Sequence, residues 1–232
     1  MAQLGFWANF KVGFVLGSLV FNLYIWLTKS PTDAKPRDVN CYFKKPKTMS
    51  QSTTIYSVSK KTFTELQNSE NRIEIDICNL AENDYCFQNS FEGVKFVLLK
   101  NKSEKTIKTL NEIFNPTEYL GDFDFDKVNF ENMYYVEEMF EFVESGNYYP
   151  YINNKTVTEI SKIISEITES EINENYSATE LNENDVYPSN WSNENIKDES
   201  NNLNHLIEDF IELKKIIIQA NKEENYLLIC SG

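Results

Sequence analysis

Histidine and glycine are scarce in this chain. Among 232 residues there is one histidine, His205, and there are seven glycines. A metal centre built from several imidazoles is therefore excluded. The glycine-dependent motifs of nucleotide-binding proteins and of serine hydrolases do not occur, so a phosphate-cradling loop is disfavoured. We expect His205 to be solvated, near the start of a helix.

Cysteine is also too rare to form a disulfide scaffold, with four residues in the whole chain. Cys78 and Cys86 lack the C-x-x-C spacing of zinc and thioredoxin sites. No catalytic motif stands out, so we expect no enzyme activity, no catalytic residue, no cofactor and no metal.

One stretch resembles a calcium-binding loop only at its start. Asp122, Asp124 and Asp126 have the D-x-D-x-D spacing, but Lys127 replaces the glycine of the turn and Met133 replaces the bidentate glutamate. The alternation predicts a solvated acidic edge instead of a metal site.

Basic residues are concentrated near the N-terminus. Residues 29–61 contain eight Lys or Arg and two Asp, whereas the chain from Thr62 onward contains 13 basic and 34 acidic residues. The acidic part argues against nucleic-acid binding, which requires neutralisation of phosphates. The basic part suits an anionic membrane surface.

The longest uncharged apolar run lies between Val12 and Thr28. At about 1.5 Å per residue, residues 6–28 are long enough to cross a hydrocarbon core of about 30 Å. We therefore predict a transmembrane anchor over residues 1–29. Gly13 and Gly17 form a G-x-x-x-G pattern that would allow helix–helix packing and weak self-association in the membrane.

The basic residues that follow the anchor place the rest of the chain on the cytosolic side of an organelle membrane. In a mitochondrial inner membrane the same rule would place it in the matrix. Four N-glycosylation sequons favour a different alternative, a luminal or extracellular glycoprotein with Cys78 and Cys86 bridged; they begin at Asn101, Asn154, Asn175 and Asn190.

The remaining chain reads as a basic linker over residues 30–52 and one acidic domain over residues 53–232. The fold class predicted is α/β, a small sandwich of four or five strands with helices. Strands are expected over 53–59, 72–78, 94–99 and 226–230. Helices are expected after Ser59 and Ser103, and over 132–145, 156–169 (with a Thr156/Glu159 capping box) and 203–221.

Residues 170–202 are rich in Glu, Asn, Ser and Asp and poor in apolar side chains. Such a composition predicts a long disordered loop before the last helix and strand. Tyr187 and Trp191 within it would then form a short linear motif.

A second aromatic group gathers around Pro150. Tyr148, Tyr149 and Tyr151 are predicted to lie in an exposed turn, where large side chains with few rotors favour protein recognition. Packing against a neighbouring element is the alternative.

These patterns predict a membrane-anchored protein whose cytosolic domain recruits a protein partner, as an assembly or biogenesis factor would. An accessory subunit of a membrane complex, mitochondrial for example, is a second hypothesis. The glycoprotein is the third.

Overall fold

The computed structural model describes residues 52–121, 148–194, 196 and 199–231. The predicted anchor with Gly13 and Gly17, the predicted helix 132–145 and the aspartate-rich stretch lie outside the described residues. So does the predicted linker 30–52, except for Ser52, which begins the first strand. Contacts divide the chain into the units Met1–Met49 and Ser50–Gly232, and the second unit is described here. Within the described ranges, no helix has the length and apolar character needed to cross a membrane.

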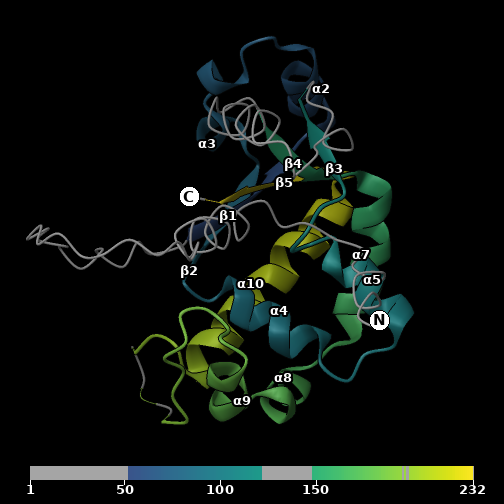
Figure 1. Cartoon of the computed structure of the whole chain (residues 1–232). Coiled ribbons are helices and arrows are strands. Elements are labelled where there is room, and N and C mark those ends of the chain that lie inside the picture. The colour runs from purple at the N-terminus through teal and green to yellow at the C-terminus, as the bar shows by residue number, and fades with distance from the viewer. Residues whose placement is uncertain (1–51, 122–147, 195, 197–198, 232) are drawn as a thin grey trace, which may run out of the picture. The chain divides into compact units, whose positions relative to one another are not determined.

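In the described part, five strands form a single antiparallel sheet in the order β2-β1-β5-β4-β3 (Figure 1). Their bounds are Ser52–Val58 for β1, Asn83–Gln88 for β2, Glu118–Leu120 for β3, Tyr149–Ile152 for β4 and Tyr226–Ser231 for β5. The C-terminal strand lies at the centre, with Ile229 opposite Ile55 of β1 and Leu228 opposite Tyr151 of β4. The structure therefore confirms a mixed α/β domain built on one sheet, and the predicted first and last strands.

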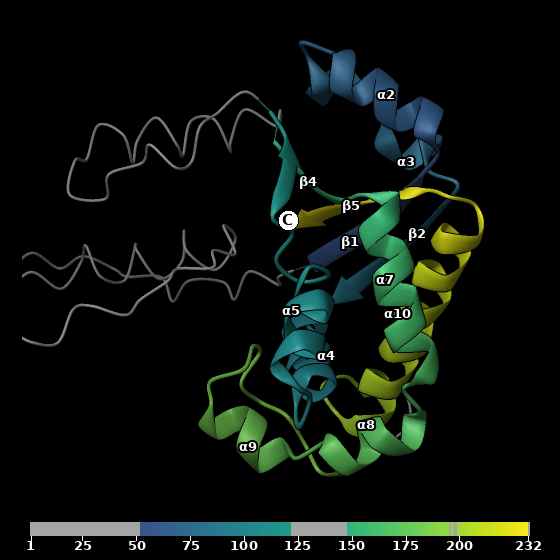
Figure 2. The ribbon, with the colours of Figure 1, turned by 90° about the vertical axis from the view of Figure 1, so that its right-hand side faces the viewer.

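Helices surround this sheet unequally. Figure 2 shows α7 and α10 running side by side next to the sheet, with α4 and α5 beyond its β2 end and α8 and α9 further away. The helices are α2 Lys60–Asn68, α3 Ile77–Leu80, α4 Phe91–Leu99, α5 Glu104–Asn111, α7 Asn154–Glu166, α8 Glu169–Asn175, α9 Ala178–Glu183 and α10 Leu203–Lys222, with a 3-10 turn at Arg72–Glu74.

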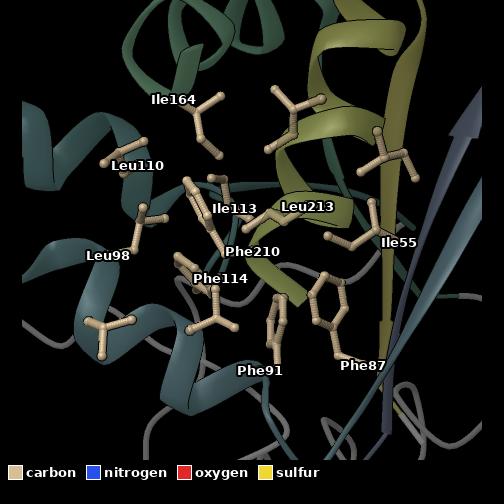
Figure 3. Packing of buried hydrophobic residues seen from close by; sticks show 14 of the residues in the cluster. Ile55, Phe87, Phe91, Leu98, Leu110, Ile113, Phe114, Ile164, Phe210 and Leu213 are labelled. Carbon is tan, nitrogen blue, oxygen red and sulfur yellow. The ribbon is translucent and has the colours of Figure 1, made fainter. Parts of the chain in front are cut away.

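The alternation of the strands produces two apolar clusters. Ile55 of β1 and Phe87 of β2 belong to the large cluster, together with Phe210 of α10 (Figure 3). Helices α4, α5, α7, α8 and α9 also contribute to it. Leu228 of β5 belongs to a smaller cluster, where Phe63 of α2 packs. Because successive side chains of a strand point to opposite faces, the sheet is apolar on both sides.

Helix α4 was predicted as a buried strand, and that prediction is wrong. Phe91, Val94 and Leu98 are buried at the spacing i, i+3, i+7 of a helix. Phe96 and Leu99 lie on another side of the same helix and are half-buried. Apolar residues on two sides of the helix produced the continuous apolar run that resembled a central strand.

The predicted strand over 72–78 is also wrong. Arg72–Glu74 forms a 3-10 turn and α3 starts at Ile77, because Asp76 caps its first turn by accepting from the Asn79 N–H at 3.3 Å. Arg72 is buried, and its Nε donates to the Leu66 carbonyl at 2.9 Å. These local side chain–backbone bonds outweigh the alternating pattern of the segment.

Helix starts were predicted well where serine is the cap. Ser59 and Ser103 accept from the N–H groups of Thr62 and Thr106, as expected. The predicted Thr156/Glu159 capping box is wrong, since Asn153 caps α7 by accepting from the Thr156 N–H at 2.9 Å. The predicted final helix is confirmed as α10.

The segment 170–202 is not a disordered loop in its described part. Ile172 of α8 and Leu181 of α9 are fully buried in the large cluster. The Asn175 side-chain amide donates to the Val97 carbonyl at 3.0 Å, and Lys100 and Lys102 pair with Glu180 and Glu171. Composition alone suggested that the entropy cost of ordering this segment would prevail. A few well-spaced apolar residues and buried hydrogen bonds offset that cost.

Candidate functional site

The tyrosine-rich segment around Pro150, predicted as a turn, forms a strand. Tyr149 and Tyr151 lie in β4, and both are half-buried. The Tyr151 ring contacts Phe63 with centroids 4.8 Å apart, and Phe63 stacks on Tyr226 at 4.0 Å. Tyr148 lies beside Tyr119, with ring centroids 5.4 Å apart, and burial, with a smaller contribution from Tyr119, raises its pKa. The predicted exposed turn is therefore wrong, whereas the role of these rings in protein recognition stays a prediction.

Trp191 is a core residue, so its prediction as an exposed recognition motif is wrong. Its side chain is 4% exposed, and its indole Nε1 donates to the Val186 carbonyl at 2.9 Å. Tyr187 is half-buried and donates its hydroxyl hydrogen to Asn89 at 3.0 Å. Both side chains hold the segment after α9 against the start of α4.

The thiols do not form the predicted alternative disulfide. Cys78, Cys86 and Cys230 are free. Cys78 lies 3.3 Å from the Tyr56 hydroxyl, and burial raises the pKa of Cys230 to about 12, to which Cys78 also contributes. A thiol with such a high pKa is a poor nucleophile. Among the described residues, no group of three or more His, Cys, Asp or Glu side chains could hold a metal ion.

The most unusual polar cluster joins α10 to β2. Asp209 is 2% exposed, and its Oδ1 accepts from the Tyr85 hydroxyl at 2.7 Å. Its Oδ2 lies 3.4 Å from His205 Nε2 and accepts no hydrogen bond from the residues that the structure describes. Burial, followed by the hydrogen bond to Asp209, raises the pKa of Tyr85, so the hydroxyl stays protonated and donates.

His205 also contacts the loop that precedes α10. Its Nδ1 accepts from the Asn201 backbone N–H at 3.2 Å, so Nδ1 carries no proton. The other ring nitrogen, Nε2, faces Asp209. The side chain is 21% exposed, so the prediction of a solvated histidine is wrong. The i, i+4 spacing of His205 and Asp209 was a usable signal for this pair, whereas the strand that supplies Tyr85 was not predicted.

The outer side of α4 forms an apolar hollow of about 360 Å³. Phe96, Leu99 and Val186 line it, together with the charged residues Glu92, Lys95 and Lys100. Lys95 pairs with Glu92 at 3.4 Å, and Lys100 pairs with Glu180. We call this hollow the α4 groove. It was missed from the sequence because Phe96 and Leu99 were assigned to a buried strand and Val186 to a disordered loop.

A second hollow, of about 350 Å³, is polar. It lies where α5, β3 and the start of α7 meet, and Lys108, Glu118 and Glu159 are among its lining residues. Internal bonds already engage its polar groups, for example Asn153 donating to Glu118 and the Thr117 N–H donating to Glu112 at 2.9 Å. Several of the polar groups that line this hollow are therefore bonded to one another.

Taken as a class, the described part is a mixed α/β domain on one antiparallel sheet, with an apolar groove on one helix. Residues 49–230 match the family described as Domain of unknown function (DUF1877), so the chain belongs to the DUF1877 family. Among solved structures, the chain is similar to one described as a protein of unknown function, YfbM from Escherichia coli. The identity is 10%, the TM-score is 0.44, and the match covers 77% of this chain and 98% of that one. No curated protein sequence matches this chain.

Proposed function

We propose that this protein is a membrane-anchored recruitment factor that binds a protein partner through the α4 groove. Residues 6–28 would hold it in an organelle membrane, with the acidic domain on the cytosolic side. The observation that carries the binding proposal is the groove itself. Phe96 and Leu99 are only half-buried although they are large and apolar, and they lie side by side with Val186. A concave apolar site with charged groups at its rim is typical of a docking surface for a side-chain anchor.

The chemistry of the partner follows from the charge of the domain. From Thr62 onward acidic residues outnumber basic ones by 34 to 13. Glu169, Glu174 and Glu183 of α8 and α9 are exposed, and Glu180 of α9 pairs with Lys100, which lines the groove. We therefore propose a basic segment of a protein that carries an aliphatic or aromatic anchor, because opposite charges accelerate association and select the partner.

Site-directed photo-crosslinking tests this docking proposal. A photoreactive phenylalanine analogue at position 96, in the full chain within its native membranes, should give one discrete crosslinked protein. The same analogue at Ile211, which is 40% exposed on α10, is the matched control and should give none. Equal crosslinking from both positions, or none from position 96, contradicts the proposal.

The anchor is tested separately. Arginine at Leu16 and Val20 would add about 2.5–3.5 kcal/mol each at the centre of a membrane helix. The double variant should be released from membranes by alkaline carbonate, whereas the natural chain should stay in the pellet. Release of the natural chain under the same conditions would contradict membrane anchoring.

The described surroundings of one sequon support the cytosolic side over the glycoprotein alternative. The Asn175 side-chain nitrogen, which a glycan would have to modify, is buried and donates to the Val97 carbonyl at 3.0 Å. A glycan there would require this bond to break.

A further inference from the structure

One face of α4 carries a carboxylate in line with the apolar part of the α4 groove. Glu92, Phe96 and Leu99 all line the groove, and their spacing of i, i+4 and i+7 places them on one side of the helix. Val94 and Leu98, by contrast, are buried in the core. At about 1.5 Å per residue, Glu92 lies about 6 Å along the helix axis from Phe96. An acidic group therefore stands about one turn away from the apolar centre of the groove.

Glu92 is held only weakly by its own chain. Its side chain is 33% exposed and pairs with Lys95 Nζ at 3.4 Å, which is longer than the distance of about 2.7–2.9 Å in a strong charge-assisted bond. Within the described ranges, this is the one ion pair that Glu92 makes. Such a pair, with both groups accessible to water, contributes little to stability. A competing cation can therefore replace Lys95 at little cost in stability.

The other ion pair of the groove is held more firmly. Lys100 pairs with Glu180 of α9 and also donates to the carbonyl of Asn175, the last residue of α8, at 3.1 Å. Displacement of this lysine would break both contacts, which come from two different helices. A cation that approaches the groove therefore finds the carboxylate of Glu92 easier to reach than that of Glu180.

We propose that Glu92 selects the partner by binding an arginine that lies beside the anchor side chain of the docked segment. A planar guanidinium forms two parallel hydrogen bonds with a carboxylate, whereas the Lys95 ammonium makes one long contact. The anchor fills the apolar part of the groove, and the arginine displaces Lys95 from Glu92. The distance of about 6 Å between the two positions matches residues i and i+2 of an extended segment or i and i+4 of a helical one. This role of Glu92 rests on the proposed function.

The first measurement uses the photoreactive phenylalanine analogue at position 96 in the full chain within its native membranes. Mass spectrometry of the crosslinked peptide should find an arginine within about four residues of the crosslinked residue. Glu92→Gln removes the charge and nearly keeps the shape of the side chain. It should lower the crosslinking yield about tenfold, the worth of about one charge-assisted hydrogen bond.

Glu104→Gln is the matched control. Glu104 is exposed in the first turn of α5, as Glu92 is in the first turn of α4, but it does not line the groove. The control therefore removes the same charge from the same part of a helix, and its crosslinking yield should equal that of the natural chain. A loss as large as that in Glu92→Gln would show a general attraction to the acidic domain and would overturn selection by Glu92.

The second measurement uses a synthetic peptide of the crosslinked segment, added to the full chain in detergent. Replacement of its arginine by citrulline, which has a similar shape without the charge, should weaken binding to the natural chain about tenfold. Binding to Glu92→Gln should be unaffected by the same replacement, because the two groups act as a pair.

The outcomes distinguish this proposal from the docking proposal that it extends. A crosslinked segment without arginine, a normal yield from Glu92→Gln, or an equal effect of citrulline on both chains overturns the role of Glu92, while docking at Phe96 stands. No crosslink from position 96 in the natural background contradicts docking, and the role of Glu92 with it.

Discussion

The Trp191 indole packs so closely against Gly93 that only glycine at position 93 leaves room for the ring. A Cβ atom built on Gly93 would lie 2.2 Å from Trp191 Cη2 and 2.4 Å from Cζ2. Carbon atoms that are not bonded to each other do not approach so closely. Glycine at this position of α4 therefore seats the indole, although glycine ordinarily lowers the stability of a helix. The contact fixes the segment after α9 against α4.

Substitution of Gly93 by alanine should destabilise the fold by about 1–3 kcal/mol through overpacking. The higher helix propensity of alanine, worth about 1 kcal/mol, would offset only part of this. The free energy of unfolding in urea measures the effect. Combining Gly93→Ala with Trp191→Phe should cost less than the sum of the two single changes, because the smaller ring leaves space. A Gly93→Ala variant more stable than the natural chain would contradict this contact.

The segment 170–194 should be required for stability, contrary to its composition. Leu181→Ala should lower the free energy of unfolding by about 2–5 kcal/mol, because the side chain is fully buried. Thr179→Ala on the exposed side of α9 is the matched control and should change it by less than about 0.5 kcal/mol. Thermal melts of the two variants would agree with each other if this segment were unpacked.

Removal of the hydrogen bond from Tyr85 to Asp209 should lower the free energy of unfolding. Tyr85→Phe leaves a buried carboxylate oxygen without its donor, which costs about 1–3 kcal/mol. Tyr226→Phe keeps the ring that stacks on Phe63 and serves as the control. In a double-mutant cycle with Asp209→Ala, which removes the acceptor, the two changes should couple by more than about 0.5 kcal/mol. Additive effects would show that the two side chains do not interact.

Stability should fall at alkaline pH because of Cys230. Burial raises its pKa to about 12 in the folded chain, from the ordinary thiol value of 9.0. Above pH 9 the unfolded chain therefore loses this proton while the folded chain keeps it. Fewer protons on the unfolded state mean that the free energy of unfolding decreases as pH rises toward 12. Cys230→Ala should reduce the slope between pH 9 and pH 10 in urea titrations, and an unchanged slope would count against this burial effect.

Local signals in the sequence predicted elements whose boundaries depend on one or two residues. Ser59 and Ser103 marked helix starts correctly, and the apolar patterns of β1, α10 and β5 were sufficient. These elements were predictable because their caps and periodicities act within one turn or one strand.

Elements decided by distant contacts were not predictable in this way. The helix α4 is apolar on two sides because one side faces the core and the other forms the groove with Val186. The ordered structure of residues 178–194 depends on the contact of Trp191 with Gly93, which lies about 100 residues earlier in the chain. His205 and Asp209 gave a local signal, but only the sheet brings Tyr85 to them.

The most direct test of recruitment through the α4 groove is the size of the native complex. The full chain, solubilised from its own membranes in mild detergent, should migrate on native gels well above its mass of 27.1 kDa. Phe96→Asp, which places a charge in the groove, should shift the chain to the position of the uncomplexed protein. Ile211→Asp should leave the complex intact. Identical migration of all three chains, whether free or complexed, would contradict docking at this groove.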